Sequence, residues 1–117
     1  MKANPNMGIV KYLYKLGTKI ETSSWGEIKR AIKVGVNSKD IIFTGPAKTT
    51  DDLDNALKYK IGIISLESIN EFFNLERLCK RKKKKINCIL RINPEEINVS
   101  SSIKMMGTSS QFGIDSK

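Results

Sequence analysis

Hydrophobic positions along this chain follow two alternating patterns. Apolar residues recur at helical spacing in segments 7–16, 25–34, a segment that begins at Thr49 or Thr50, and 68–80. Short, nearly continuous apolar runs typical of buried strands occupy segments 18–22, 41–44, 62–66 and 87–92. Because such strands alternate with one-sided helices, the pattern predicts βα units that form a parallel sheet covered by helices.

The ends of the expected strands are regularly spaced. They fall at Lys2, Glu21, Thr44, Glu67 and Arg91, at intervals of 19, 23, 23 and 24 residues. Neither a G-x-G-x-x-G turn nor a G-x-x-x-x-G-K-[ST] loop follows any strand, which disfavours an open nucleotide-binding sheet and favours a barrel. Barrels carry their chemistry at the carboxyl ends of the strands. Polar residues gather at those ends here, namely Lys2, Asn4, Glu21, Thr22, Ser23, Ser24, Thr44, Glu67, Arg91 and Asn93.

The apolar face of the fourth expected helix is predicted to pack in the core. It comprises Ile69, Phe72, Phe73, Leu75 and Leu78.

With 117 residues, 39% hydrophobic and 28% charged, the chain has the composition of one globular domain with a modest core. No apolar stretch is long enough to cross a bilayer, and no leader with a cleavage site opens the chain, so membrane anchoring and secretion are disfavoured.

Cysteine and histidine content narrows the chemistry. The chain has two cysteines, Cys79 and Cys88, and no histidine. Zinc-finger ligand sets and histidine-based triads are therefore excluded, and a reducing, cytoplasmic location fits best.

The net charge of +9 comes mainly from one segment. Residues 80–85 (KRKKKK) supply six positive charges, leaving 15 basic against 12 acidic residues elsewhere. We expect this run to form the last turn of a helix and the loop after it, where cations complement the helix dipole. A surface that tracks phosphates would need basic and aromatic residues spread over one face, so a nucleic-acid partner is disfavoured.

Lys2 is the candidate for covalent chemistry. A lysine at the mouth of a barrel has a lowered pKa, so that its neutral amine can form a Schiff base with an aldehyde. Spacing alone favours a different interpretation, in which Lys2 is simply part of a basic, unstructured amino terminus.

Six segments resemble, in order, the motifs of one enzyme family. They are 1–4 (MKAN, like Y-A-x-K-A-N), 21–27 (ETSSWGE, like D-x-A-S-x-G-E), 41–48 (IIFTGPAK, like I-I-F-x-G-P-x-K), 64–68 (ISLES, like V-E-S), 89–94 (ILRINP, like L-R-I-N-P) and 111–114 (QFGI, like K-F-G-I). The chain thus resembles the fold-type III pyridoxal-phosphate decarboxylases, the diaminopimelate, ornithine and arginine decarboxylase group. Together these segments span nearly the whole chain.

The resemblance implies a cofactor and roles for three residues. Lys2 would carry pyridoxal 5'-phosphate as the Schiff-base lysine, and the cofactor would take up the electrons released when the α-carboxylate leaves. Arg91 would lie close to the cofactor and keep its phenolic oxygen ionised. Glu21 stands where the family has an aspartate that could tune the protonation of the linkage.

The resemblance also implies a substrate class and an assembly. The substrate would be an amino acid, and Gln111 and residues 106–110 are similar to relatives that act on carrier-linked amino acids. The full-length form would be a homodimer.

Length sets the expected extent of the domain. A complete barrel takes about 250 residues, so we expect residues 1–117 to be a partial TIM-like (β/α) barrel of the alanine racemase-like type, roughly half of one, without the carboxyl-terminal β domain. Such a fragment would bind the cofactor weakly and decarboxylate poorly. Two alternatives remain open: a noncatalytic scaffold or regulatory relative that pairs with a full-length enzyme, and a basic nucleic-acid-binding module.

Overall fold

The alternation of helices and strands is present in the computed structural model, which describes residues 1–93 and 113–115. In chain order the elements are α1 (Met7–Lys15), β1 (Ile20–Thr22), α2 (Trp25–Lys33), the 3-10 helix η1 (Ser38–Asp40), β2 (Ile41–Phe43), α3 (Thr50–Tyr59), β3 (Ile63–Leu66), α4 (Ile69–Lys82), β4 (Asn87–Leu90), β5 (Ile92–Asn93) and β6 (Ile114–Asp115). Each expected βα unit is therefore confirmed, with boundaries shifted by one or two residues.

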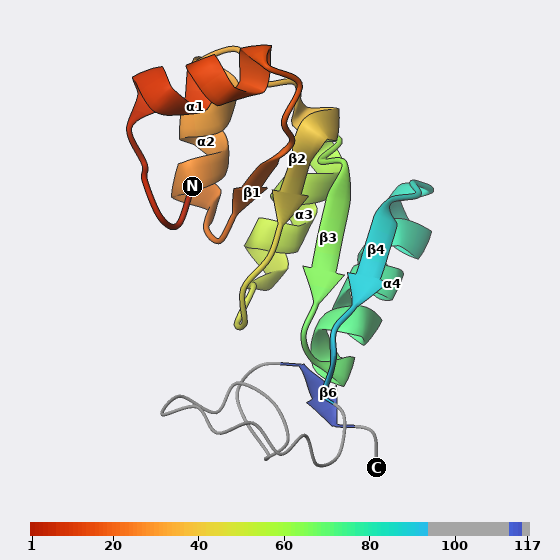
Figure 1. The fold of residues 1–117 in the computed structure, drawn as a ribbon. Coiled ribbons are helices and arrows are strands. Elements are labelled where there is room, and N and C mark those ends of the chain that lie inside the picture. The colour runs from red at the N-terminus through yellow and green to blue at the C-terminus, as the bar shows by residue number, and fades with distance from the viewer. Residues whose placement is uncertain (94–112, 116–117) are drawn as a thin grey trace, which may run out of the picture.

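Strands β1 to β4 form one parallel sheet in the order in which they occur along the chain (Figure 1). Helices α2, α3 and α4 cover one face of this sheet. A doubly wound sheet would reverse its strand order and carry helices on both faces. Sequential order with one covered face is instead the arrangement of successive units of a barrel, and four parallel strands are half of the usual eight.

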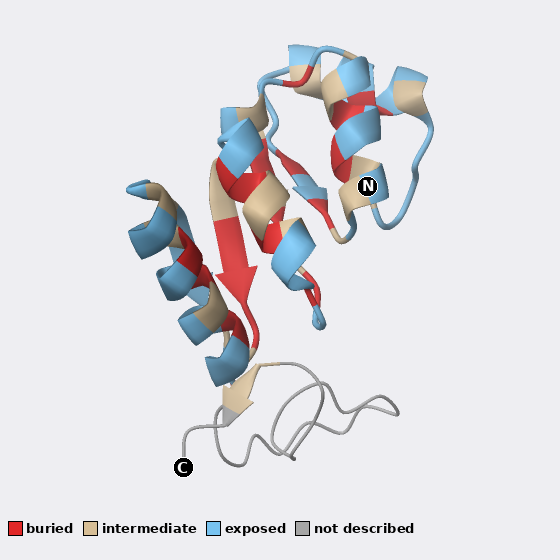
Figure 2. Ribbon diagram, turned by 180° about the vertical axis from the view of Figure 1, so that it is seen from behind, coloured by how far each residue is buried: buried red, intermediate tan, exposed pale blue. Residues whose placement is uncertain are grey.

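Burial alternates along β1 and β2 as the pleat requires. Thr22, Phe43 and Ile64 occupy equivalent positions on neighbouring strands and are 0%, 1% and 0% exposed. Phe43 and Ile64 belong to the hydrophobic core between the sheet and the helices, which Figure 2 shows from the helix side. The preceding residues, such as Glu21 and Ile42, point to the other face and are more accessible.

Side-chain caps define where the helices begin. The hydroxyls of Ser24 and Ser68 accept hydrogen bonds from backbone N–H groups in the first turns of α2 and α4. Thr49 forms a capping box with Asp52 at the start of α3. These residue types satisfy N–H groups that have no partner inside the helix, so the sequence signal for each start has a direct physical cause.

Two expectations about the fourth helix meet different outcomes. Ile69, Phe72 and Phe73 are 51%, 37% and 53% exposed, so the prediction that these three residues belong to the core is wrong. Leu75 and Leu78 are the buried apolar residues of α4 and anchor the helix in the core. The basic run behaves as expected: its first three residues end α4, and Lys83 caps the helix in the left-handed conformation.

The sequence also places a strand end at Lys2, and this expectation is wrong, since no strand precedes α1. The side chain of Asn4 accepts a hydrogen bond from the backbone N–H of Asn6 at 2.9 Å, which turns the segment toward α1. The amino group of Met1 still donates to the carbonyl oxygen of Glu21 at 2.6 Å. The segment that carries Lys2 therefore lies beside the end of β1 but does not form a strand of the sheet.

Candidate functional site

The first part of the site lies where β1 and β2 end. The amine of Lys2 is 3.1 Å from Oε1 of Glu21, and both side chains are about half exposed. The hydroxyl of Thr44 donates to the same carboxylate oxygen at 2.9 Å. The hydrogen bond from Thr44, and then that from Lys2, lower the pKa of Glu21 below its ordinary value. Glu21 is therefore held as an anion next to an accessible amine.

The second part lies where β3 and β4 end. Glu67 is buried, and its two carboxylate oxygens have different partners. The backbone N–H of Gly45 donates to Oε1 at 2.8 Å, and Nη1 of Arg91 donates to Oε2 at 3.2 Å. The Arg91 side chain is 38% exposed. The buried Glu67 carboxylate thus holds the Arg91 guanidinium in one orientation, while part of the Arg91 side chain remains exposed to solvent.

A buried ion pair supports both parts. Nζ of Lys48 is 3.1 Å from Oε2 of Glu71, and the two side chains are only 2% and 7% exposed. Glu71 also accepts backbone hydrogen bonds from Lys48 and Glu67, each at 3.0 Å. Nζ of Lys48 donates in turn to the carbonyl oxygen of Gly45. The turn after β2 and the turn after β3 are therefore joined by charged groups that water does not reach.

The turn after β2 adopts an unusual backbone conformation. Ala47 has a φ of 63°, and Gly45 has a φ of 100°. A left-handed conformation at a residue other than glycine costs about 1–2 kcal/mol, so contacts around it must hold it in place. The backbone bonds from Gly45 to Glu67 and from Lys48 to Glu71 supply those contacts.

The three site residues expected from the sequence all lie at this edge of the sheet. Lys2 and Glu21 are in direct contact. Arg91 belongs to the neighbouring cluster around Glu67, which adjoins Thr44 through the peptide to Gly45. Gln111 and residues 106–110, which bear on the expected substrate, lie outside the described residues.

Sequence reasoning missed the roles of Glu71 and Lys48. A signal for Glu71 was present, because Ser68 precedes it by three residues in the spacing of a capping box, and the side chain does turn back toward the residues before the helix. No local signal marks Lys48 as buried, since its partner lies 23 residues away along the chain.

Further observations limit or extend the chemistry. Among the described residues, no group of three or more His, Cys, Asp or Glu side chains is arranged to hold a metal ion. Over the same residues, no helix has the length and apolar character needed to cross a membrane.

The hydroxyl of Ser23, in the turn after β1, is buried and has no hydrogen-bond partner within the described part of the chain. An accessible amine, a positioned guanidinium and an unsatisfied hydroxyl at one edge suit a small ligand that carries an aldehyde and anionic groups.

Comparisons with known proteins identify relatives of the whole chain. The family model described as "Pyridoxal-dependent decarboxylase, pyridoxal binding domain" matches residues 1–117. The L-glutamyl-[BtrI acyl-carrier protein] decarboxylase of Niallia circulans is 36% identical over 115 residues, covering 98% of this chain and 27% of that protein. The diaminopimelate decarboxylase of Campylobacter jejuni is 39% identical over 94 residues, covering 80% of this chain and 23% of that protein.

Solved structures give the same result for the fold. Diaminopimelate decarboxylase from M. jannaschii in complex with L-lysine matches with a TM-score of 0.81 at 30% identity, over 97% of this chain and 26% of that one. The arginine decarboxylase of Paramecium bursaria Chlorella virus matches with a TM-score of 0.73 at 26% identity, over 97% and 28%. The chain thus spans about a quarter of the length of these relatives. By its sequence over all 117 residues and by its fold, the chain belongs to the pyridoxal-dependent decarboxylase family and corresponds to part of the pyridoxal binding domain.

Proposed function

We propose that this chain supplies the lysine-bearing part of the site of a pyridoxal-phosphate-dependent amino acid decarboxylase. The observation that carries the proposal is the contact between Lys2 and Glu21 at the edge of the sheet where the strands end. It pairs an accessible amine with a carboxylate whose pKa is lowered, so the carboxylate stays charged at neutral pH. When bound, pyridoxal phosphate supplies an electron sink for the electron pair released as carbon dioxide leaves.

Each residue of this edge has a defined task in the proposal. Lys2 would hold the cofactor covalently through Nζ, and Glu21 would keep that nitrogen protonated by accepting its hydrogen bond. Arg91 would place its positive charge beside an anionic oxygen of the ligand, in an orientation set by Glu67. Ser23 would give its unsatisfied hydroxyl a partner on the same ligand.

The substrate class follows from the relatives. Diaminopimelate and arginine decarboxylases act on free amino acids by their names, which supports an amino acid with an α-carboxylate. A carrier-linked amino acid is a second candidate, supported by the relative from Niallia circulans, which matches 98% of the chain.

Completion of the site depends on groups beyond those described. The curated relatives extend to about four times the length of this chain, which supports a site finished by further parts of a barrel domain and by a β domain. We therefore expect residues 1–117 on their own to have little or no decarboxylase activity.

Assembly as a homodimer in the cytoplasm belongs to the same proposal. Two free cysteines, Cys79 and Cys88, support a reducing location.

Covalent labelling tests the proposal directly. The purified chain is mixed with one equivalent of pyridoxal phosphate, reduced with borohydride to fix any link to lysine, and mapped by peptide mass spectrometry. We expect most of the label on Lys2 and its loss in Lys2→Ala. Lys11→Ala, an exposed lysine on α1, is the matched control and should label normally. Label spread over the basic run 80–85 and unchanged by Lys2→Ala would refute the assignment and favour a noncatalytic relative.

A further inference from the structure

The basic run divides into a paired half and an unpaired half. Lys80 lies 2.7 Å from Glu76, and Lys82 lies 2.6 Å from Asp54, which Arg81 also approaches. Beyond the end of α4 this pattern stops. In the described part of the chain, Lys84 and Lys85 have no carboxylate within ion-pair distance.

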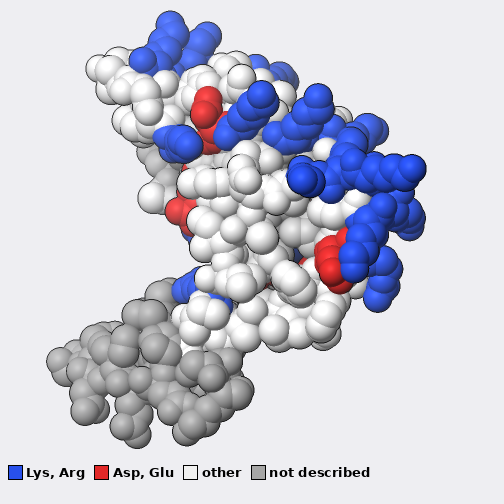
Figure 3. Space-filling model, turned by 90° about the vertical axis from the view of Figure 1, so that its right-hand side faces the viewer, with Lys and Arg blue, Asp and Glu red and all other residues white. Residues whose placement is uncertain are grey.

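These unpaired lysines border a hollow at the opposite end of the sheet from the candidate site. The hollow has a volume of about 470 Å³ and lies where the strands begin, among the loops that lead into β1, β2, β3 and β4. Five lysines line it, namely Lys19, Lys39, Lys60, Lys84 and Lys85. Figure 3 shows how basic side chains gather at this end of the molecule. No Asp or Glu is among the lining residues.

The loops that carry these lysines are held close together by their backbones. The N–H of Gly62 donates to the carbonyl oxygen of Ser38 at 3.0 Å. A side chain at Gly62 would come within 1.9 Å of the carbonyl oxygen of Lys39, so only glycine permits this approach. Lys60 ends α3 in the left-handed conformation, with its N–H bonded to Ala56. The positions from which the lysines extend are therefore fixed, while their stems remain adjustable.

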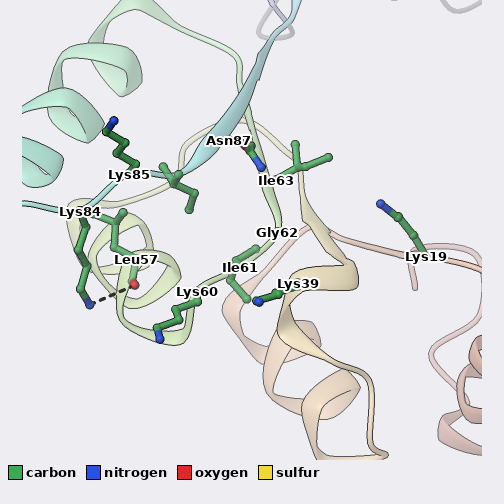
Figure 4. A pocket seen from close by; sticks show the side chains of 11 residues that line it. Lys19, Lys39, Leu57, Lys60, Ile61, Gly62, Ile63, Lys84, Lys85 and Asn87 are labelled. Carbon is green, nitrogen blue, oxygen red and sulfur yellow. Dashed lines mark hydrogen bonds between the residues drawn. The ribbon is translucent and has the colours of Figure 1, made fainter.

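Two of the five lysines, Lys60 and Lys84, lie at or near the carboxyl end of α3. Nζ of Lys84 donates to the carbonyl oxygen of Leu57 at 3.4 Å, near the end of α3 (Figure 4). This contact complements the negative end of the α3 dipole. Within the described residues, Lys19, Lys39, Lys60 and Lys85 line the hollow without a carboxylate partner, so no ion pair compensates their four positive charges.

We propose that this hollow binds a small oligophosphate anion. Its volume lies within the range of small-ligand pockets. Lysine ammonium groups act as adjustable point charges on phosphate oxygens, and no acidic residue lines the hollow to compete with a bound anion. Like charges that lack partners repel one another, and a multiply charged anion placed between them replaces that repulsion with attraction.

The site is separate from the proposed decarboxylase site, because its lysines lie at the amino ends of the strands and Lys2, Glu21 and Arg91 lie at the carboxyl ends. The inference therefore does not rest on the proposed function. An oligophosphate could reach the hollow as an inorganic chain or as part of a nucleotide, and the shared feature is the phosphate chain.

Calorimetric titration of the 117-residue chain with inorganic tripolyphosphate tests the proposal. The variant Lys84→Gln/Lys85→Gln removes two lining charges, and Lys80→Gln/Arg81→Gln removes two charges from the paired half of the same run. Two surface contacts of intermediate strength together correspond to about tenfold in affinity. We expect one binding site that is about tenfold weaker in the first variant and changed less than about twofold in the second.

The alternatives give different results. Equal loss of affinity in both variants would show that binding depends only on the net charge of the chain, and would overturn the proposal. The absence of measurable binding would overturn it as well. Titrations with ATP and adenosine distinguish the sources. Binding of ATP that is lost in Lys84→Gln/Lys85→Gln, with none of adenosine, supports recognition of the phosphate chain. Binding of adenosine alone would overturn it.

Discussion

Replacing Glu71 tests whether the buried ion pair with Lys48 holds the two turns of the site together. Removing one partner of a buried pair leaves an uncompensated charge and costs about 3–5 kcal/mol. Glu71→Leu also removes the acceptor for two backbone N–H groups, those of Lys48 and Glu67, at about 1–3 kcal/mol each. The total reaches or exceeds about 5 kcal/mol, which is the lower end of the stability of a whole domain.

Lys48→Met is the informative comparison. It removes the ammonium but leaves the Glu71 carboxylate with both backbone donors, so we expect a loss near the low end, about 3 kcal/mol. The double variant Lys48→Met/Glu71→Leu removes both charges and takes their partners from the two N–H groups and from the carbonyl oxygen of Gly45. It should therefore be more stable than Glu71→Leu alone, by about 1–3 kcal/mol. Glu76→Leu, which breaks an exposed pair on α4, should cost less than about 0.5 kcal/mol.

Urea unfolding followed by tryptophan fluorescence measures these changes. Trp25 on α2 packs edge-to-face against Tyr59 on α3, with ring centroids 5.1 Å apart, so its emission reports the packing of two helices. The reasoning would be refuted if Lys48→Met cost as much as Glu71→Leu, or if the losses in the double variant were simply additive. Either result would mean that the two charges act independently of each other and of the backbone donors.

Three further predictions follow from particular contacts. Thr44→Val removes the largest cause of the lowered pKa of Glu21, so an NMR titration of that carboxyl should move to higher pH. In the wild type the contribution of Glu21 to stability is complete above the ordinary carboxyl pKa and is lost as the pH falls through the lowered one. Gly62→Ala forces a methyl group onto the carbonyl oxygen of Lys39 and should cost about 3 kcal/mol in the same urea assay, whereas an unchanged midpoint would contradict the close approach. Thr49→Ala removes a helix cap and should cost about 1 kcal/mol, with Thr49→Ser restoring most of it.

The order of elements could be predicted from the sequence because each one depends on local properties. Ser24, Thr49 and Ser68 mark helix starts through hydrogen bonds to their own first turns. Strand positions follow from short apolar runs, and sequential parallel order follows from the lengths of the connections. The same local reasoning failed at Phe72 and Phe73, because helical spacing identifies an apolar face but not how far the facing sheet extends.

In the candidate site too, the residues could be identified from the sequence, but the contacts around them could not. Lys2, Glu21 and Arg91 were identified from motifs, and the structure places them at one edge. Their environments could not be read from the chain. That Glu67 has its two oxygens on Gly45 and Arg91 depends on three turns meeting in space.

By itself, the sequence determined the family, the alternation of strands and helices, and the residues that follow each strand. All of these depend on the order and spacing of residues that are close together along the chain. Only the tertiary structure decided which charges are neutralised. Lys48 and Lys84 are both basic residues near turns, yet one is buried against Glu71 and the other borders a hollow without a carboxylate. The difference arises because the electrostatic state of a side chain depends on partners brought from distant positions, and on how much water the packing around them excludes.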